Sequence, residues 1–260
     1  MVRPGRGRAN TSPGTGVRGG GHQGPGFDVL SSKAQPSRPM SDSSCQACRP
    51  SSIGKKVIMA ITGLVLAGFV LGHMTGNLLM FKGPKAIDDY AAWLHANPLL
   101  VWTARVVLLA STAAHIWAGV TLTLENRAAR DGGPSVDATR RATLGSRTMP
   151  YSGGVLLAFI VFHLLHYTFQ AAALGGQKFD SVYRMVVAGF TSVPVSAFYI
   201  VSMLLLCLHL GHGFSSLFQT LGLRNERWRA RLDRLALAYA WIVALGFVSI
   251  PLAVLVGRLK

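Results

Sequence analysis

The residues best suited to chemistry are histidines that lie inside long apolar stretches of the chain. Four separate runs carry them, two with a single histidine and two with a close pair: His73; His115; His163 and His166; His209 and His212. The run LLLCLHLGHGFSSLFQTLG, which contains the last pair, has no carboxylate to accompany it. A polar ring in apolar surroundings needs a partner, and a metal is the simplest partner for several imidazoles.

Haem iron suits this pattern because a flat macrocycle fits between apolar helices. A bis-histidine haem uses only two protein ligands, so four runs with an imidazole each suffice for two b-type haems. Two imidazoles per iron leave no open coordination position. The pattern therefore favours electron transfer over oxygen binding or activation.

The elements that must position these rings are apolar stretches of about 20 residues or more. Five of them occur, at residues 54–81, 98–125, 148–174, 193–221 and 235–257. The connections between them are too short for another domain. We predict an all-α fold, an integral membrane bundle of five transmembrane helices over residues 53–258. The fifth helix has no histidine, so we assign it to packing.

Residues 1–52 differ from the rest in composition. They are rich in Gly, Pro, Ser and Arg, so we predict a disordered basic N-terminal arm. The first apolar run begins only near Val57 and is long enough to remain as a span, which argues against a secretory signal. Met40 is an alternative start of translation. Mass spectrometry of the N-terminus would test it, because peptides from residues 1–39 would exclude that start.

The cysteines give no cofactor site of their own. Cys45 and Cys48 form a lone CxxC, but Arg49 follows where covalent haem attachment needs histidine, and zinc would need a second pair. We interpret that pair as incidental and Cys207 as an ordinary apolar helix residue.

Cations indicate how the bundle is oriented. The net charge is +16, and 19 of the 26 Lys and Arg residues lie in the arm up to Lys56 or in segments 126–147 and 222–234. Only six lie in the segments on the opposite side. This bias places the N-terminus in the cytoplasm and the C-terminus outside. The charge suits anionic lipid headgroups of the bilayer and gives no reason to invoke nucleic acid.

Helical rise gives each histidine a depth. Counted from the inner cationic edge, His73 and His163 lie about 24–26 Å deep and His115 about 18 Å deep. His209 and His212 lie about 22 and 18 Å deep. Depth therefore pairs His73 with His163 at an outer site, whereas the partner of His115 at an inner site stays open.

Two further choices stay open. His163 and His166 are three residues apart and share a helix face, so spacing alone does not say which of them binds iron. Arg105 lies about 15 Å outward of His115. It either pairs with a propionate of the outer haem or snorkels to the outer headgroups.

The predicted outer half of the bundle also contains a row of glycines and an acidic connection. Gly68, Gly72 and Gly76 recur every four residues beside His73, and we favour haem packing there over a helix-dimer groove. The connection KGPKAIDDYAAWLHANP reads as an interfacial loop, with a quinone pocket near the outer haem as the alternative. It carries four polar or aromatic candidates: Asp88, Asp89, Trp93 and His95.

Residues 53–258 resemble the two-haem cytochrome b membrane anchor of succinate:quinone oxidoreductases, the succinate dehydrogenase and fumarate reductase family. The resemblance rests on LGHMTGN, AAHIWAG, FHLLHYT, MVVAGFTSVPVSAFYIVSM and LHLGHGFSSLFQTLG. It implies two stacked haems held by four helices of a five-helix bundle.

Carried over by position, the resemblance implies axial iron ligands at two sites. They are His73 and His163 for the outer haem, and His115 and His209 for the inner haem. His209 is preferred because the family motif has a histidine four residues before a glycine, here Gly213. His166 and His212 become the less favoured alternatives.

The resemblance also implies partners and a role. A flavoprotein subunit with FAD would interconvert succinate and fumarate, the step in the tricarboxylic acid cycle, and an iron–sulfur subunit would dock on the cytoplasmic face of a bacterial inner (plasma) membrane. Electrons would pass through both haems to a membrane quinone, with menaquinone as the expected type. The chain itself carries no succinate or flavin motif, so it would be a subunit without the catalytic site.

Two other functions remain as alternatives. A cytochrome b anchor of another quinone-linked dehydrogenase or hydrogenase would share the helices and histidines. A non-redox helical membrane protein would use its histidines to bridge helices. No span has an acidic residue near its centre, which argues against a carboxylate-lined proton path through the helices.

Overall fold

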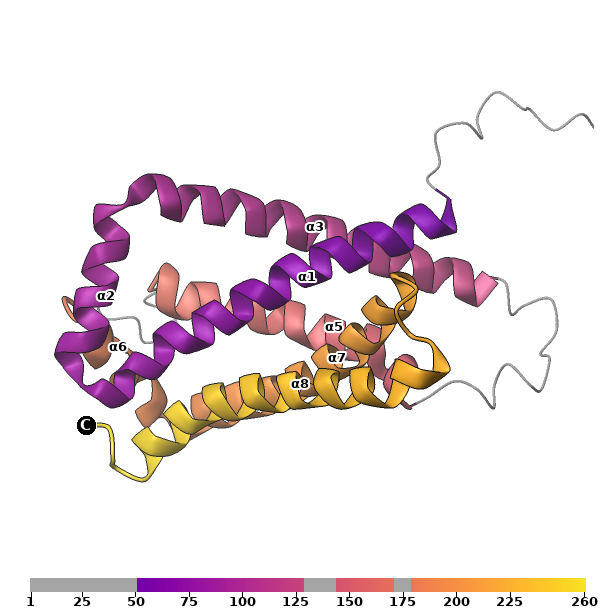
Figure 1. The fold of residues 1–260 in the computed structure, drawn as a ribbon. Coiled ribbons are helices and arrows are strands. Elements are labelled where there is room, and N and C mark those ends of the chain that lie inside the picture. The colour runs from indigo at the N-terminus through magenta and orange to yellow at the C-terminus, as the bar shows by residue number, and fades with distance from the viewer. Residues whose placement is uncertain (1–50, 129–143, 171–178) are drawn as a thin grey trace, which may run out of the picture. The chain divides into compact units, whose positions relative to one another are not determined.

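All secondary structure in the described part of the chain is helical, as the apolar pattern predicts (Figure 1). The computed structural model describes residues 51–128, 144–170 and 179–260. The predictions for the N-terminal arm, including Met40 and the CxxC pair, lie outside these residues.

Among the described residues, five helices are long and apolar enough to cross a membrane, in agreement with the predicted number and class. Their bounds are α1 Ser52–Asn77 with its 3-10 continuation η1 Leu78–Lys82, α3 Pro98–Ala128, α5 Leu144–His163 with the π-helical turn η2 Leu164–Thr168, α7 Val193–Thr220, and α8 Glu226–Leu255. The third span ends at Thr168 rather than at residue 174, because the chain leaves the helix at Phe169.

Helix boundaries follow local capping chemistry. The Ser51 hydroxyl accepts a hydrogen bond from the Gly54 amide at 3.2 Å and caps α1. Asn225 caps α8 by accepting from the Trp228 amide at 3.0 Å. This cap lies inside the predicted basic connection, so α8 begins nine residues earlier than the apolar pattern indicates. Pro194 lies in the first turn of α7, as predicted.

Two short helices replace predicted connections on the outer side. Helix α2 (Pro84–Ala96) occupies the expected interfacial loop, and α6 (Val182–Thr191) precedes α7. Asp88 of α2 joins them, because its carboxylate accepts from the Ser181 hydroxyl at 2.7 Å and from the Tyr183 amide at 3.1 Å. Hydropathy did not predict α2 and α6 as membrane spans because both helices are too short to cross a bilayer.

The long helices pack most extensively as α7 with α8, α1 with α3, and α5 with α7 (Figure 1). Large apolar side chains such as Leu99, Leu109 and Leu208 are exposed on the bundle, which suits lipid contact. Cys207 is buried among apolar neighbours, as predicted. Two clusters form the core: Met80, Ile87, Tyr183, Val186, Phe190, Tyr199, Ile250, Ala253, Val254 and Leu259; and Ala67, Met74, Cys207, Leu210, Ala240, Val243 and Ala244.

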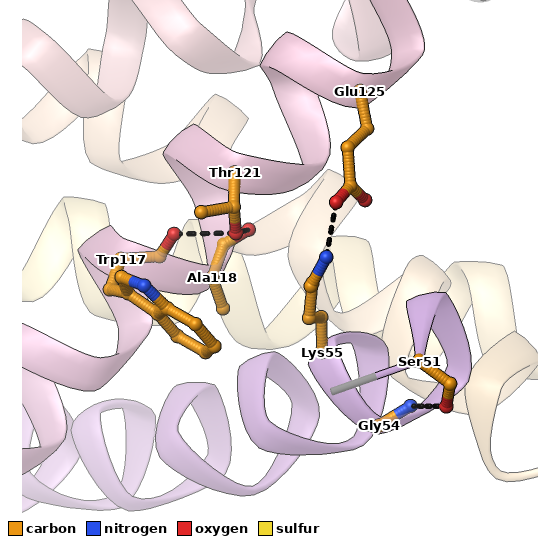
Figure 2. Close-up of polar contacts among 7 residues, drawn as sticks. All are labelled: Ser51, Gly54, Lys55, Trp117, Ala118, Thr121 and Glu125. Atoms are coloured by element: carbon orange, nitrogen blue, oxygen red, sulfur yellow. Dashed lines mark hydrogen bonds and ion pairs between the residues drawn. The ribbon is translucent and has the colours of Figure 1, made fainter. Parts of the chain in front are cut away.

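Ion pairs tie the helices together at the end that the cation pattern predicts to be the inner one. Lys55 of α1 is buried, and its ammonium pairs with the carboxylate of Glu125 on α3 (Figure 2). Asp233 of α8 accepts from Arg224 at 2.8 Å and from the Ser215 hydroxyl of α7 at 2.8 Å. A buried charge such as that of Lys55 needs a partner, so this pair holds α1 against α3 at this end.

Candidate functional site

The structure brings His73 of α1 beside His163 of α5. Their ring centroids are 5.8 Å apart and their planes are inclined at 80°. Phe69 stacks on His73 at 5.3 Å, and Phe159 stacks on His163 at 5.8 Å. Helix α8 adds Phe247, 5.8 Å from His73. These two histidines, called the outer pair below, therefore lie in an aromatic surrounding built by three helices.

His115 of α3 and His209 of α7 form a second pair, called the inner pair below. Their ring centroids are 6.3 Å apart, with planes inclined at 58°. Glycines make room for both rings. A Cβ on Gly63 would lie 3.3 Å from Cε1 of His115, and one on Gly153 would lie 3.8 Å from Cε1 of His209.

Both separations suit two rings on one metal. A metal–nitrogen bond is about 2 Å long, and the ring centre lies about 1 Å beyond the nitrogen. The centres of two imidazoles bound to one metal would therefore be about 6 Å apart. Across the described ranges, no group of three or more His, Cys, Asp and Glu side chains could hold a metal ion. A haem needs only two such ligands because its porphyrin supplies the other four.

Hydroxyl groups face the inner pair. Oγ1 of Thr62, on α1, lies 3.2 Å from Nδ1 of His115. Oγ of Ser152, on α5, lies 3.3 Å from Nδ1 of His209. Each histidine is thus contacted by a helix other than its own.

A phenol faces the outer pair. Tyr199 Oη of α7 lies 3.3 Å from Nδ1 of His163 and 3.3 Å from Nδ1 of His166. His73 differs, because its polar neighbour is the Asn77 amide. This amide donates to the His73 carbonyl oxygen at 2.8 Å and lies 3.4 and 3.5 Å from the two ring nitrogens.

Helical rise sets the separation between the two pairs. On α1, Thr62 at the inner level and His73 at the outer level are eleven residues apart. On α5, Ser152 and His163 have the same spacing, and Tyr199 and His209 on α7 are ten residues apart. Three helices therefore agree on a separation of about 16 Å along the bundle.

The two alternative histidines lie beside these pairs. His166 occupies the π-helical turn η2 and packs against Tyr167, with ring centroids 4.2 Å apart. π-Turns recur at functional sites, because the extra residue changes which side chains face inward. His212 lies one turn beyond His209 on α7.

The glycine face of α1 borders open space, and haem packing against it stays a prediction. Gly68 and Gly72 have no neighbouring atom within 4 Å of an added Cβ, and they line a surface groove of about 520 Å³ with Gly76 and Tyr90. His73 is not among the residues that line this groove. The glycines that lie directly against imidazoles are Gly63, beside His115, and Gly153, beside His209.

The remaining candidates lie near the surface. Arg105 is exposed, and its guanidinium carbon lies 4.9 Å from the ring centre of Trp102, an arrangement that suits the interfacial alternative. Asp89 forms an ion pair with Lys85 at 2.6 Å, and both residues lie on α2, so this contact is within one helix. Trp93 stacks on Tyr90, with ring centroids 6.4 Å apart, and His95 is exposed.

Sequence reasoning missed the hydroxyl residues Thr62, Ser152 and Tyr199. A signal was present for two of them, because Thr62 precedes His73 and Ser152 precedes His163 by eleven residues. Eleven residues are close to three helical turns, so each hydroxyl shares a helix face with the histidine that follows it.

One comparison with known proteins gave a match. A family model described as the succinate dehydrogenase/fumarate reductase transmembrane subunit matches residues 135–248. The matched part includes His163, Tyr199 and His209, while His73 and His115 precede it. No curated protein and no solved structure matches the chain.

Proposed function

We propose that this chain is the membrane anchor and electron-transfer subunit of a succinate dehydrogenase or fumarate reductase, with two b-type haems. The proposal depends on one observation. Four helices bring four histidines together as two pairs, and the ring separation in each pair suits two imidazoles bound to one iron. The family match over residues 135–248 supports the same reading. His73 and His163 would hold the outer haem, and His115 and His209 the inner haem.

An orphaned hydroxyl supports the fit of such a group. Ser202 is fully buried, and its oxygen has no hydrogen-bond partner. It precedes His209 by seven residues on α7, two turns, so the two share a helix face. A buried hydroxyl without a partner is unfavourable. A haem held beside this face of α7 would supply, through a propionate, the acceptor that Ser202 lacks.

The chain's own residues would hold the haems, orient the histidines that bind them and separate the haems from the surroundings. Bound haem iron supplies one-electron transfer, and two imidazoles per iron leave no position for oxygen. Phe69, Phe159 and Phe247 pack against the outer pair and would give its site an apolar lining. The outer and inner pairs are about 16 Å apart along the bundle. Two haems at these levels would let electrons cross much of the bilayer in steps.

The partners follow from this role. A flavoprotein subunit with FAD and an iron–sulfur subunit would lie at the end that carries Lys55 and Glu125, which the cation pattern places in the cytoplasm. The electron acceptor or donor in the bilayer would be a quinone, with menaquinone as the expected type. The setting is a bacterial inner membrane, with the C-terminus outside.

The test is haem content of the full chain, purified in detergent with its associated subunits. A reduced-minus-oxidised spectrum with pyridine-haemochrome quantitation should give two low-spin b haems per chain. Alanine at each of four positions should remove one haem: His73, His115, His163 and His209. Alanine at His166 or His212 should leave both haems, and the exposed His95 provides a neutral control.

Three outcomes would redirect the proposal. Loss of a haem in H166A but not in H163A would show that the other member of that pair binds iron. A haem-containing chain that copurifies with subunits lacking covalent flavin would indicate a cytochrome b anchor of another dehydrogenase or a hydrogenase. A colourless preparation would leave only the non-redox reading.

A further inference from the structure

We propose that Thr62, Ser152 and Tyr199 are positioning residues that fix the tautomer of the ligand histidines. Each hydroxyl oxygen accepts a hydrogen bond from Nδ1–H of one ligand histidine (His115, His209 or His163), which leaves Nε2 of that ring for the metal. The inference rests on the proposed haem function. It assigns a role to three residues that do not themselves touch the iron.

At the inner pair the hydroxyl protons are already committed. The Thr62 hydroxyl donates to the Ile58 carbonyl oxygen at 2.7 Å, and the Ser152 hydroxyl donates to the Met149 carbonyl oxygen at 3.0 Å. A hydroxyl has one proton and two acceptor lone pairs. Each oxygen therefore remains as an acceptor toward its histidine, and the imidazole must be the donor.

The tautomer of both inner rings follows. A neutral imidazole carries its proton on one nitrogen and a lone pair on the other. With the protons of His115 and His209 on Nδ1, facing Thr62 and Ser152, the lone pairs lie on Nε2. A hydrogen bond from the distant ring nitrogen is the usual way in which a ligand histidine is oriented and made more basic.

Tyr199 separates the roles of the two histidines on α5. Its single phenolic proton lies between Nδ1 of His163 and Nδ1 of His166, both at 3.3 Å. His163 faces His73, so its Nε2 is needed for iron and its Nδ1–H donates to Tyr199. The Tyr199 proton then goes to Nδ1 of His166. His166 thus carries its own proton on Nε2 and orients the phenol, rather than serving as a ligand.

The two sites are held differently as a result. Both inner ligands are anchored by aliphatic hydroxyls whose protons are bound to the backbone of their own helices. The outer site has one ligand anchored by a hydroxyl, His163, whereas His73 has only the Asn77 amide beside it, which donates to the His73 carbonyl oxygen and lies within 3.5 Å of the ring nitrogens. Loss of a hydroxyl should therefore change one haem and leave the other unchanged.

The experiment uses T62V, S152A and Y199F in the full chain with its associated subunits. Haem retention is measured by transfer to apomyoglobin, and reduction potentials by spectroelectrochemical titration. T62V and S152A should each speed loss of the inner haem by about tenfold or more and raise its potential, since the imidazole becomes a weaker electron donor. Y199F should do the same to the outer haem alone.

Conservative variants separate positioning from packing. T62S and S152T keep the hydroxyl and should retain the parental potentials. T121V on α3 removes a hydroxyl that donates to the carbonyl oxygens of Trp117 and Ala118, and it should change neither haem.

The inference is overturned if T62V and S152A match the parent in retention and potential while H115A still removes a haem. It is equally overturned if T62S, which keeps the hydroxyl, loses the inner haem as fast as T62V, because the loss would then not follow the hydroxyl. Absence of haem from the parent chain would refute the proposed function instead, so the two failures are distinguishable.

Discussion

Gly63 is the residue on which access to the inner pair depends most directly. A Cβ there would lie 3.3 Å from Cε1 of His115, a contact that requires the ring to move. We expect G63V to displace His115 and to remove or loosen the inner haem while the outer haem stays. Haem quantitation together with the low-spin spectrum would measure the loss.

Gly68 provides the matched control for that substitution. It lies on the same helix, and an added Cβ would meet no atom within 4 Å. G68V should therefore leave His115 and the inner haem in place. Loss of the inner haem in G68V but not in G63V would refute this role of Gly63, and loss of the outer haem in G68V would support the predicted haem packing against the glycine face of α1.

At this scale the sequence identified the histidines and not their partners. A histidine in a long apolar run is unusual, so His73, His115 and His209 stand out without a structure. Serine and threonine are ordinary in such helices, because their hydroxyls bond to the backbone one turn earlier. Only the rotation of α1 and α5 relative to their neighbours shows that Thr62 and Ser152 face imidazoles.

Asp88 is the element-scale link between the short helices α2 and α6. Its carboxylate accepts from the Ser181 hydroxyl and from the Tyr183 amide at the start of α6. We expect D88A to destabilise the docking of α6 by about 1–2 kcal/mol, because a cap and a side-chain hydrogen bond are lost together. Thermal unfolding of the detergent-solubilised complex would show the decrease.

The neighbouring Asp89 is the control for D88A. It pairs with the exposed Lys85 on the same helix, so its removal should have little effect on unfolding. An equal decrease in D88A and D89A would mean that α2 needs its charge rather than its contact with α6.

The two short helices also show where sequence reasoning ended at this scale. Hydropathy over about 20 residues detects spans and not helices of 10 or 13 residues. The first three turns of α8 were assigned to a loop because they are basic, although Asn225 is a good helix cap. Apolar pattern predicts burial in lipid, whereas capping chemistry decides where a helix begins.

The orientation of the bundle in the membrane is a prediction for the whole molecule. The ion pairs Lys55–Glu125 and Arg224–Asp233 both lie at the end that the cation bias assigns to the cytoplasm. Alkaline phosphatase fused after Lys260 should be active, because the cation bias places that terminus outside. Phosphatase inserted after Asn225 should be inactive. The reverse pattern would invert the proposed orientation and move the iron–sulfur partner to the other face.

Helices α1, α5 and α7 each place the inner and outer levels at nearly the same distance along the bundle, and this has a mechanical consequence. A continuous α-helix keeps its rise per residue, so a thinner or thicker bilayer changes the tilt of these helices before it changes their length. The gap that an electron must tunnel across would then be independent of lipid chain length. Transfer between the two irons should run at the same rate in short-chain and long-chain nanodiscs.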